Sequence, residues 1–405
     1  MNQAHEREHP TRSLLRSRIL MAARAHLSLI STLMLGVTMS ALRGESQDLR
    51  APVSPPSTVS SHGLRGARAS ATACAHCHSE ITGEWTLSQH RTSWTDEVFQ
   101  SAYRLEPMQF CRGCHAPLNP DAQPVPTGEA AHDGISCRVC HGENNSARAV
   151  AASEEITAQR ARCGGCHQFN FPAFLLTQGG MALASAPMQD TFGEWQRAVA
   201  SGMTETCQSC HMPWVRGPEG RRHRSHRFEG SRSQALLSSA LITDVRATRR
   251  AHGVLTAHVL VRADHVGHAV PTGDVFRRLV VRVWLDQNQS ESREIVYARQ
   301  YESRYERDPA GELRWVRREV QDTRVQPPSQ ALVSPREVHF ANVTPSTHTL
   351  HWRIEHQLMP PEQAASKHIA DAVNRMLIRE GEIAIDAANS QVNSNPTPPG
   401  APPRG

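Results

Sequence analysis

Cys74-Ala-His-Cys77-His78 is the first of five copies of one pattern, and the five copies use every cysteine of the chain. In each copy two residues separate the cysteines and a histidine follows directly, which is the attachment motif of c-type haem. The thiols add across the two vinyl groups of one haem, and the histidine binds the iron as proximal ligand. The pattern therefore predicts five covalent haems. The other copies are Cys111-Arg-Gly-Cys114-His115, Cys137-Arg-Val-Cys140-His141, Cys163-Gly-Gly-Cys166-His167 and Cys207-Gln-Ser-Cys210-His211.

Disulfides and zinc are the alternative uses of these cysteines. Neither requires a histidine directly after each second cysteine. With 23 His in 405 residues, five such placements arise by chance on the order of once in a million. Paired free thiols also tend to oxidise in an exported chain, which argues against zinc. Haem c is therefore the preferred interpretation.

The N-terminal residues 1–41 have the pattern of a cleaved signal peptide. Residues 27–41 are apolar, small residues close the segment, and Arg12, Arg16, Arg18 and Arg24 precede it. A membrane anchor is the alternative, but this apolar stretch is short for a span. No later stretch is apolar enough to cross a bilayer, so we expect no transmembrane segment after cleavage. Export to the periplasm or beyond agrees with haem attachment, which takes place outside the cytoplasm.

The charge balance gives no support to nucleic-acid binding. The formal net charge is +5, and residues 1–41 contribute five Arg and two Glu, or +3, which leaves +2 for the mature chain. Five ferric haems with their propionates would add about −5, so the loaded protein would carry about −3. Lys367 is the sole lysine, and we expect some arginines to pair with propionates, whose carboxylates suit the guanidinium fork.

The chain divides into a cysteine-containing part and a strand-rich part, which predicts an α+β fold. The haem part is expected to be small, helical and rich in loops, because five cofactors between residues 74 and 211 must supply much of their own core. Helices are predicted at Glu80–Val98 and Asp190–Ser201, with Trp85 and Trp195 as packing residues. The expected segments are a flexible linker at 42–70, a pentahaem domain at 71–235, a β-sandwich at 236–358, a C-terminal helix at 359–390 and a disordered tail at 391–405.

The strand-rich part alternates β-branched and polar residues, which predicts an antiparallel sandwich. A helix is predicted after it at Glu362–Arg379, with Ile369, Val373, Met376 and Leu377 on one face. The predicted strands are 254–261, 278–285, 294–298, 337–340 and 349–354.

Each iron also needs a ligand in its sixth position, and four histidines are predicted to supply one. His90 lies on the first predicted helix, His132 is too near Cys137 to reach that haem and would serve a neighbour, and His268 lies in a Gly- and Pro-rich turn of the sandwich. Of His223 and His226, we choose His226 because Phe228 could pack on a porphyrin. The fifth position is unassigned or open, with Met181 and Met188 as thioether options and His62, His252, His258 and His265 as weaker candidates.

Over about residues 71–275 the chain resembles multihaem c-type cytochromes of the cytochrome c-554 type. The matching pieces are Trp85-Thr-Leu-Ser88-Gln-His90 after the first motif, Asp133-Gly-Ile-Ser-Cys137 running to Gly142, Gln189-Asp-Thr-Phe-Gly-Glu-Trp195, and Met212-Pro213 after the last motif. The resemblance implies that His90 is a distal ligand. Gly267-His268-Ala-Val-Pro-Thr-Gly273 is similar to a segment of multihaem cytochromes that carry a C-terminal β-domain, which implies the same for His268. The chain departs from the c-554 type in having five motifs rather than four and an added β-domain.

An exported electron carrier is the leading functional hypothesis, with redox proteins such as other cytochromes or a quinol-linked membrane complex as partners. The alternative is a multihaem oxidoreductase that acts on nitrite, hydroxylamine or nitric oxide at a five-coordinate haem. Ammonia-forming nitrite reductases with five haems typically have Cys-x-x-Cys-Lys in one motif, whereas all five motifs here end in His. A third possibility gives the β-domain a docking role.

Overall fold

The computed structural model describes residues 71–119, 126–141, 163–175, 181–218, 220–308, 310–327, 334–385 and 391–394. The expected signal peptide, the expected linker and His62 lie outside these ranges. Among the helices that the structure describes, none is long and apolar enough to cross a membrane.

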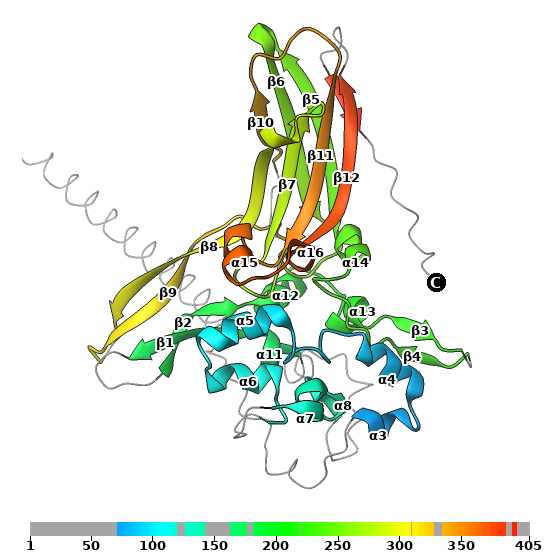
Figure 1. Cartoon of the computed structure of the whole chain (residues 1–405), viewed down its shortest axis with the longest axis vertical. Coiled ribbons are helices and arrows are strands. Elements are labelled where there is room, and N and C mark those ends of the chain that lie inside the picture. Colours follow the sequence, from blue (N-terminus) through cyan, green and yellow to red (C-terminus); the bar gives the residue numbers. More distant parts are fainter. Residues whose placement is uncertain are drawn as a thin grey trace, which may run out of the picture. The chain divides into compact units, whose positions relative to one another are not determined.

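The cysteine-containing segment folds as short helices joined by turns, as the sequence predicts (Figure 1). The helix predicted at Asp190–Ser201 is confirmed as α12. The predicted packing residues Trp85 and Trp195 are both buried. The helices are α3 (Ala71–Ala75), α4 (Ser79–Thr86), α5 (Glu97–Leu105), α6 (Gln109–His115), α7 (Gly128–Asp133), α8 (Cys137–His141), α11 (Gly165–His167), α12 (Thr191–Ala200) and α13 (Cys207–His211).

The prediction of one helix over Glu80–Val98 is wrong, because α4 ends at Thr86 and α5 begins at Glu97. The hydroxyl of Ser88 donates to the carbonyl of Trp85 at 2.7 Å and accepts from the amide of Arg91 at 3.3 Å. A serine that bonds to nearby backbone in this way competes with the helical ladder. His90 therefore lies in a turn between two helices.

The strand-rich part is a sandwich of two antiparallel sheets, which confirms the predicted class and all five predicted strands. Alternate residues of both sheets, among them Val259, Val281 and Ile354, form one buried core between them. One sheet has the order β12-β11-β7-β8-β9-β1-β2 and the other β10-β6-β5-β13. Their strands here are β5 (Leu241–Arg250), β6 (Val254–Ala263), β7 (Arg278–Leu285), β8 (Arg293–Arg307), β9 (Leu313–Asp322), β10 (Arg336–Phe340), β11 (His348–Gln357), β12 (Arg375–Ile385) and β13 (Gln391–Ser394), and the connecting helices are α14 (Gln234–Ser239), η3 (Ala251–Gly253) and η4 (Gln289–Glu291).

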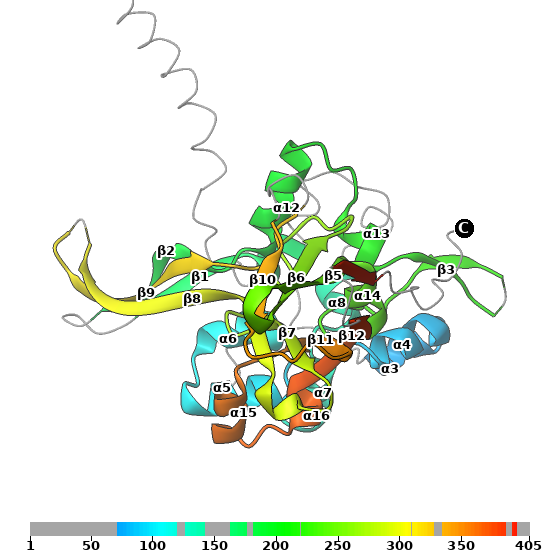
Figure 2. The same ribbon diagram turned by 90° about the horizontal axis from the view of Figure 1, so that it is seen from above.

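The larger sheet continues beyond the sandwich into the cysteine-containing segment. The first part of β8 pairs with β7, and from Arg299 onward β8 pairs with β9. β9 then pairs with β1 (Phe169–Leu175), which pairs with β2 (Met181–Gln189). Figure 2 shows these four strands extending together to one side of the sandwich. The sequence analysis predicted neither this extension nor the hairpin of β3 (Trp214–Arg216) and β4 (Arg222–Arg224).

The predicted helix Glu362–Arg379 is wrong for most of its length. Two short helices, α15 (Pro361–Ser366) and α16 (Asp371–Asn374), precede strand β12. Asn374 ends α16 by donating to the carbonyl of Met359 and accepting from its amide, both at 3.0 Å. Ile383 and Ile385 then alternate with exposed residues and fill the core, as a strand requires.

The expected segment boundaries also change at the C-terminal end. Strands of the sandwich extend past 358 to Ile385, and Gln391–Ser394 pairs with β5, so the expected tail begins as a strand. Residues 395–405 lie outside the described part.

Candidate haem sites

Each attachment motif lies on or beside a short helix. In α6, α8 and α13 the histidine is the last helical residue, and in α11 it ends the fourth motif. Residues three apart lie on the same face of a helix, so both thiols of a motif point the same way. No disulfide joins any of the ten cysteines, all of which the structure describes. The thiols and the following histidine therefore fit covalent haem, and they do not form the alternative disulfides.

Three proximal histidines face three of the histidines predicted as distal ligands. The ring centroids are 6.4 Å apart for His167 and His90, 6.2 Å for His141 and His226, and 6.1 Å for His211 and His268. Two metal–nitrogen bonds of about 2 Å each, plus the ring radii, would place trans imidazoles about 6 Å apart. Each pair is therefore spaced to hold one iron between its rings.

Backbone carbonyls fix the tautomer of several of these rings. Nδ1 of His211 donates to the carbonyl of Glu229 at 2.6 Å, that of His226 to Arg224 at 2.8 Å, and that of His268 to Ala269 at 3.0 Å. A carbonyl only accepts, so Nδ1 carries the proton and Nε2 keeps a lone pair for a metal. Hydrogen bonding of the other ring nitrogen is the usual arrangement of histidine ligands.

Burial favours the neutral form, which binds metal, for three of the paired imidazoles. It lowers the pKa of His90 to about 3, with smaller effects from His167 and His211. Burial likewise lowers the pKa values of His167 and His268 to about 4. Desolvation penalises the charged form of a basic group, which explains the direction of all three shifts.

The first and second motifs have no distal histidine opposite them in a ring pair among the described contacts. His132 is exposed on α7, and the amide of Ala71, at the start of α3, donates to the neighbouring Asp133. This places His132 beside the helix that carries Cys74. Ligation of a neighbouring haem by His132 stays a prediction.

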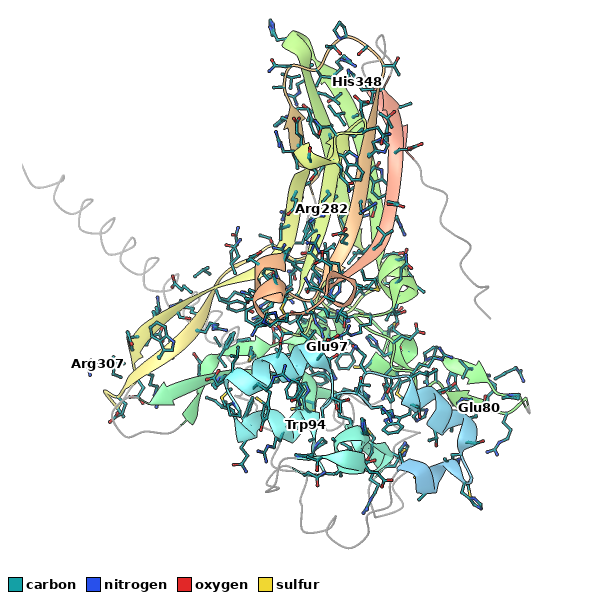
Figure 3. The ribbon with its side chains drawn as sticks, viewed as in Figure 1. Glu80, Trp94, Glu97, Arg282, Arg307 and His348 are labelled. Carbon is teal, nitrogen blue, oxygen red and sulfur yellow. The ribbon has the colours of Figure 1, made fainter. Side chains whose placement is uncertain are left out.

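His115 of the second motif packs on an aromatic ring. Phe99 stacks on its imidazole at 3.7 Å between centroids with an 8° interplanar angle. Nδ1 of His115 donates to the carbonyl of Ser93 at 2.7 Å. Phe99 in turn contacts the buried Trp94 at 5.6 Å; Figure 3 shows Trp94 among the helices. The orientation of the His115 ring is thus fixed by Phe99 and by the carbonyl of Ser93.

The remaining candidates from the sequence have other partners or positions. His223 lies 3.2 Å from Glu84, and His258 on β6 contacts Thr248 at 2.9 Å. His265 is exposed, and His252 lies in η3. Met188 and Met181 lie on β2. None of these four histidines forms a ring pair with a proximal histidine among the described contacts.

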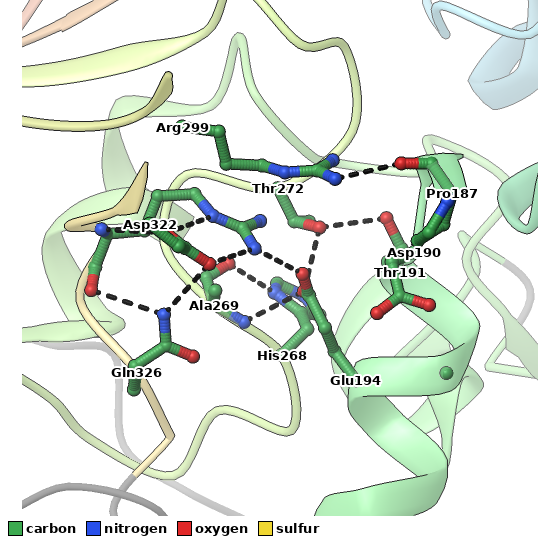
Figure 4. Close-up of polar contacts among 12 residues, drawn as sticks. Pro187, Asp190, Thr191, Glu194, His268, Ala269, Thr272, Arg299, Asp322 and Gln326 are labelled. Carbon is green, nitrogen blue, oxygen red and sulfur yellow. Dashed lines mark hydrogen bonds and ion pairs between the residues drawn. The ribbon is translucent and has the colours of Figure 1, made fainter. Parts of the chain in front are cut away.

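Two glutamates that the sequence did not single out contact the histidine segments, and one further histidine is buried. Glu84 accepts from the amide of His226 at 2.8 Å and also contacts His223. Glu194, within the block that resembles other multihaem proteins, binds the loop of His268 (Figure 4). His356 at the end of β11 is buried, and its Nε2 has no hydrogen-bond partner among the described residues. Contacts between distant segments define these roles, so no local pattern reveals them.

Thiols of different motifs contact one another. Hydrogen bonds join the side chains of Cys74 and Cys137, of Cys114 and Cys166, and of Cys163 and Cys207. Phe228 lies between two of the ring pairs, 4.3 Å from His90 and 5.6 Å from His226. The attachment points of the fourth motif therefore adjoin those of the second and fifth, and Phe228 links it to the third.

Comparisons with known proteins find similarity in both sequence and fold. The sequence model of the family described as "Cytochrome c554 and c-prime" matches residues 73–142. The solved structure of a penta-heme cytochrome c552 from Thermochromatium tepidum is similar with a TM-score of 0.55 and 19% sequence identity, over 78% of this chain and 99% of that one. At this identity the likeness shows a shared fold. A comparison with curated proteins finds no match.

Proposed function

We propose that this chain, a multihaem c-type cytochrome related to the cytochrome c554 family through residues 73–142, carries electrons between redox proteins through five haems. Haem c supplies reversible one-electron chemistry when bound. The observation that carries the proposal is the set of three proximal–distal histidine pairs with ring centroids 6.1 to 6.4 Å apart. Two protein ligands leave an iron no open position for a substrate, which suits a carrier.

The contacts between motifs support a branched order of the five sites. The first adjoins the third through Cys74 and Cys137, and the fourth adjoins both the second and the fifth through Cys166 and Cys163. Phe228 connects the third to the fourth. These contacts support an order in which the fourth motif has three neighbours.

Export to the periplasm or beyond is part of the proposal. It is supported by the charged and apolar pattern of residues 1–41 and by the site of haem attachment outside the cytoplasm. The partners would be other redox proteins. They could include other cytochromes or a quinol-linked membrane complex.

One observation favours catalysis at a single haem as a second candidate function. His115 is stacked on Phe99, and no histidine faces it in a ring pair among the described residues. A haem with an open position there could bind nitrite, hydroxylamine or nitric oxide. His356, with its buried and unpartnered Nε2, is the histidine that could instead complete a sixth position.

Counting the spin states of the haems in the purified holoprotein tests the two functions. The carrier predicts five low-spin ferric haems by electron paramagnetic resonance and near-infrared magnetic circular dichroism. The enzyme hypothesis would replace the carrier hypothesis if one haem is high-spin and the protein turns over a nitrogen species faster than free haem does.

A further inference from the structure

Helix α12 packs against the loop that presents His268. Gly267 lies so close to this helix that a Cβ on it would be 2.7 Å from Sδ of Met203 and 2.9 Å from Cδ1 of Trp195. On the other side of His268, the amide of Ala269 donates to Oε2 of Glu194 at 3.0 Å. Both neighbours of the histidine in sequence are thus in contact with α12 or the residues that follow it.

Glu194 binds this loop at two points with one carboxylate oxygen. Besides the amide of Ala269, the hydroxyl of Thr272 donates to Oε2 at 3.0 Å (Figure 4). The hydroxyls of Thr272 and Thr191 are 2.8 Å apart, which adds a contact to the start of α12. Charge-assisted bonds of this kind are stronger than neutral ones and hold their donors in a defined geometry.

An ion pair holds the carboxylate itself in place. The side chain of Glu194 is 3% exposed, and its Oε1 lies 2.6 Å from a guanidinium nitrogen of Arg324. Arg324 also pairs with Asp322 at 2.7 Å and donates to the carbonyl of Pro271 at 3.3 Å. A buried carboxylate is costly unless it is paired and hydrogen-bonded, so this network makes the position of Glu194 stable.

The direction of the imidazole follows from these contacts. Ala269 is held at both ends, because its amide donates to Glu194 and its carbonyl accepts from Nδ1 of His268. Rotation of Ala269 would break the first bond and turn the ring. Val270 adds two backbone bonds to Val325, at 2.8 and 3.0 Å, and fixes the next residue of the loop.

We propose that Glu194 is the positioning residue of His268: through the Ala269 amide and Thr272 it aims the imidazole at the iron of the fifth haem. The inference rests on the proposed ligation of that haem by His268 opposite His211. In this proposal Glu194, on a helix of the cysteine-containing segment, controls the orientation of His268, which lies in a loop of the sandwich.

Four variants of the full-length holoprotein test the proposal. His268→Ala identifies the haem, because one of the five low-spin signals should become high-spin. Glu194→Ala should make the same haem partly high-spin and shift its reduction potential, while Glu194→Gln, which keeps an acceptor for the Ala269 amide, should do so less. Arg197→Ala is the matched control, since it removes a half-exposed ion pair with Asp190 from the same helix without touching the loop, and should leave all five signals unchanged.

Two results would overturn the inference in distinguishable ways. If His268→Ala leaves every haem low-spin, the ligand assignment fails and the role of Glu194 fails with it. If His268→Ala acts as expected but Glu194→Ala and Glu194→Gln only lower the melting temperature, Glu194 is merely structural. In the double variant Glu194→Ala/His268→Ala, positioning predicts no spectral change beyond that of His268→Ala alone.

Discussion

At several histidines a hydrogen bond from Nδ1 to a backbone carbonyl leaves Nε2 available for a metal. His226 and His268 have such bonds and keep Nε2 free, whereas His223 uses its Nε2 to contact Glu84. The attachment cysteines were predictable because covalent chemistry fixes their spacing. The preference for His226 rested on Phe228, whereas the side chain that bonds to its amide is Glu84, 142 positions away in sequence. The sequence assigned no distal partner to His115, and no ring pair among the described residues supplies one.

The pair His223 and His226 allows a matched test of ligation. His226→Ala should convert one low-spin haem to high-spin, because it removes the ring that faces His141 at 6.2 Å. His223→Ala should leave all haem spectra unchanged and cost only the contact with Glu84, which is about 1 kcal/mol or less. Magnetic circular dichroism of both variants checks this. A spectral change in His223→Ala alone would reverse the assignment.

At the scale of elements, a glycine turn controls where His90 lies. Gly134 has φ 47° and ψ −126°, a conformation open mainly to glycine, and a Cβ there would be 2.4 Å from the carbonyl oxygen of His90. The next amide, of Ile135, donates to that carbonyl at 2.8 Å, and the indole of Trp85 donates to the carbonyl of Ile135 at 2.9 Å. Trp85 of α4 and the turn after α7 therefore jointly fix the backbone position of His90.

Substitution of this glycine should disturb one haem and weaken the fold. Gly134→Ala should lower the free energy of unfolding by roughly 3 kcal/mol or more, because backbone strain and a steric clash add together. It should also change the spectrum of the haem held by His167 and His90. Gly202→Ala is the control, since Gly202 has φ 100° but open space around it, and should cost only about 1 kcal/mol. Chemical denaturation measures both; equal losses would show that the clash is absent.

Local pattern predicted some elements better than others. The five strands predicted between Val254 and Ile354 were found at the predicted places, whereas β9 between them was not predicted. For β12 the spacing of Ile369, Val373 and Leu377 suggested a helix. Tertiary packing overrides that spacing, because Gly381 lies under Trp352, where a Cβ would be 2.6 Å from Cζ2. Pairing with β11 therefore determines the strand.

At the scale of the whole described molecule, the haem segment and the sandwich form one hydrogen-bonded structure. β1 pairs with β9, and the guanidinium of Arg299 on β8 donates to the carbonyls of Met188 and Pro187, both at 2.8 Å. The ion pair of Glu194 with Arg324 joins the same two segments. The sequence predicted a cysteine-containing and a strand-rich segment but gave no sign of these connections, since both partners of each contact are far apart along the chain.

Loss of Arg299 should destabilise both segments together. The side chain is 6% exposed and also pairs with Glu319, so Arg299→Ala leaves two carbonyls and a carboxylate unpaired and should cost about 2 to 4 kcal/mol. Arg304→Ala on the same strand removes an exposed ion pair and should cost less than about 0.5 kcal/mol. Denaturation followed by haem absorbance and by tryptophan fluorescence should give coincident transitions. Separate transitions in the wild type would contradict the coupling.

The order in which ligands occur along the chain also sets an order of assembly. All five attachment motifs end by His211, yet His226 and His268 follow them, and His268 is held by a loop after β6 that bonds to Val325. A chain emerging from its N-terminus can receive every haem before the sandwich exists. Ligation of the fifth haem by His268, as proposed, would wait until the sandwich has folded, so the absorption spectrum of that haem would report completed folding.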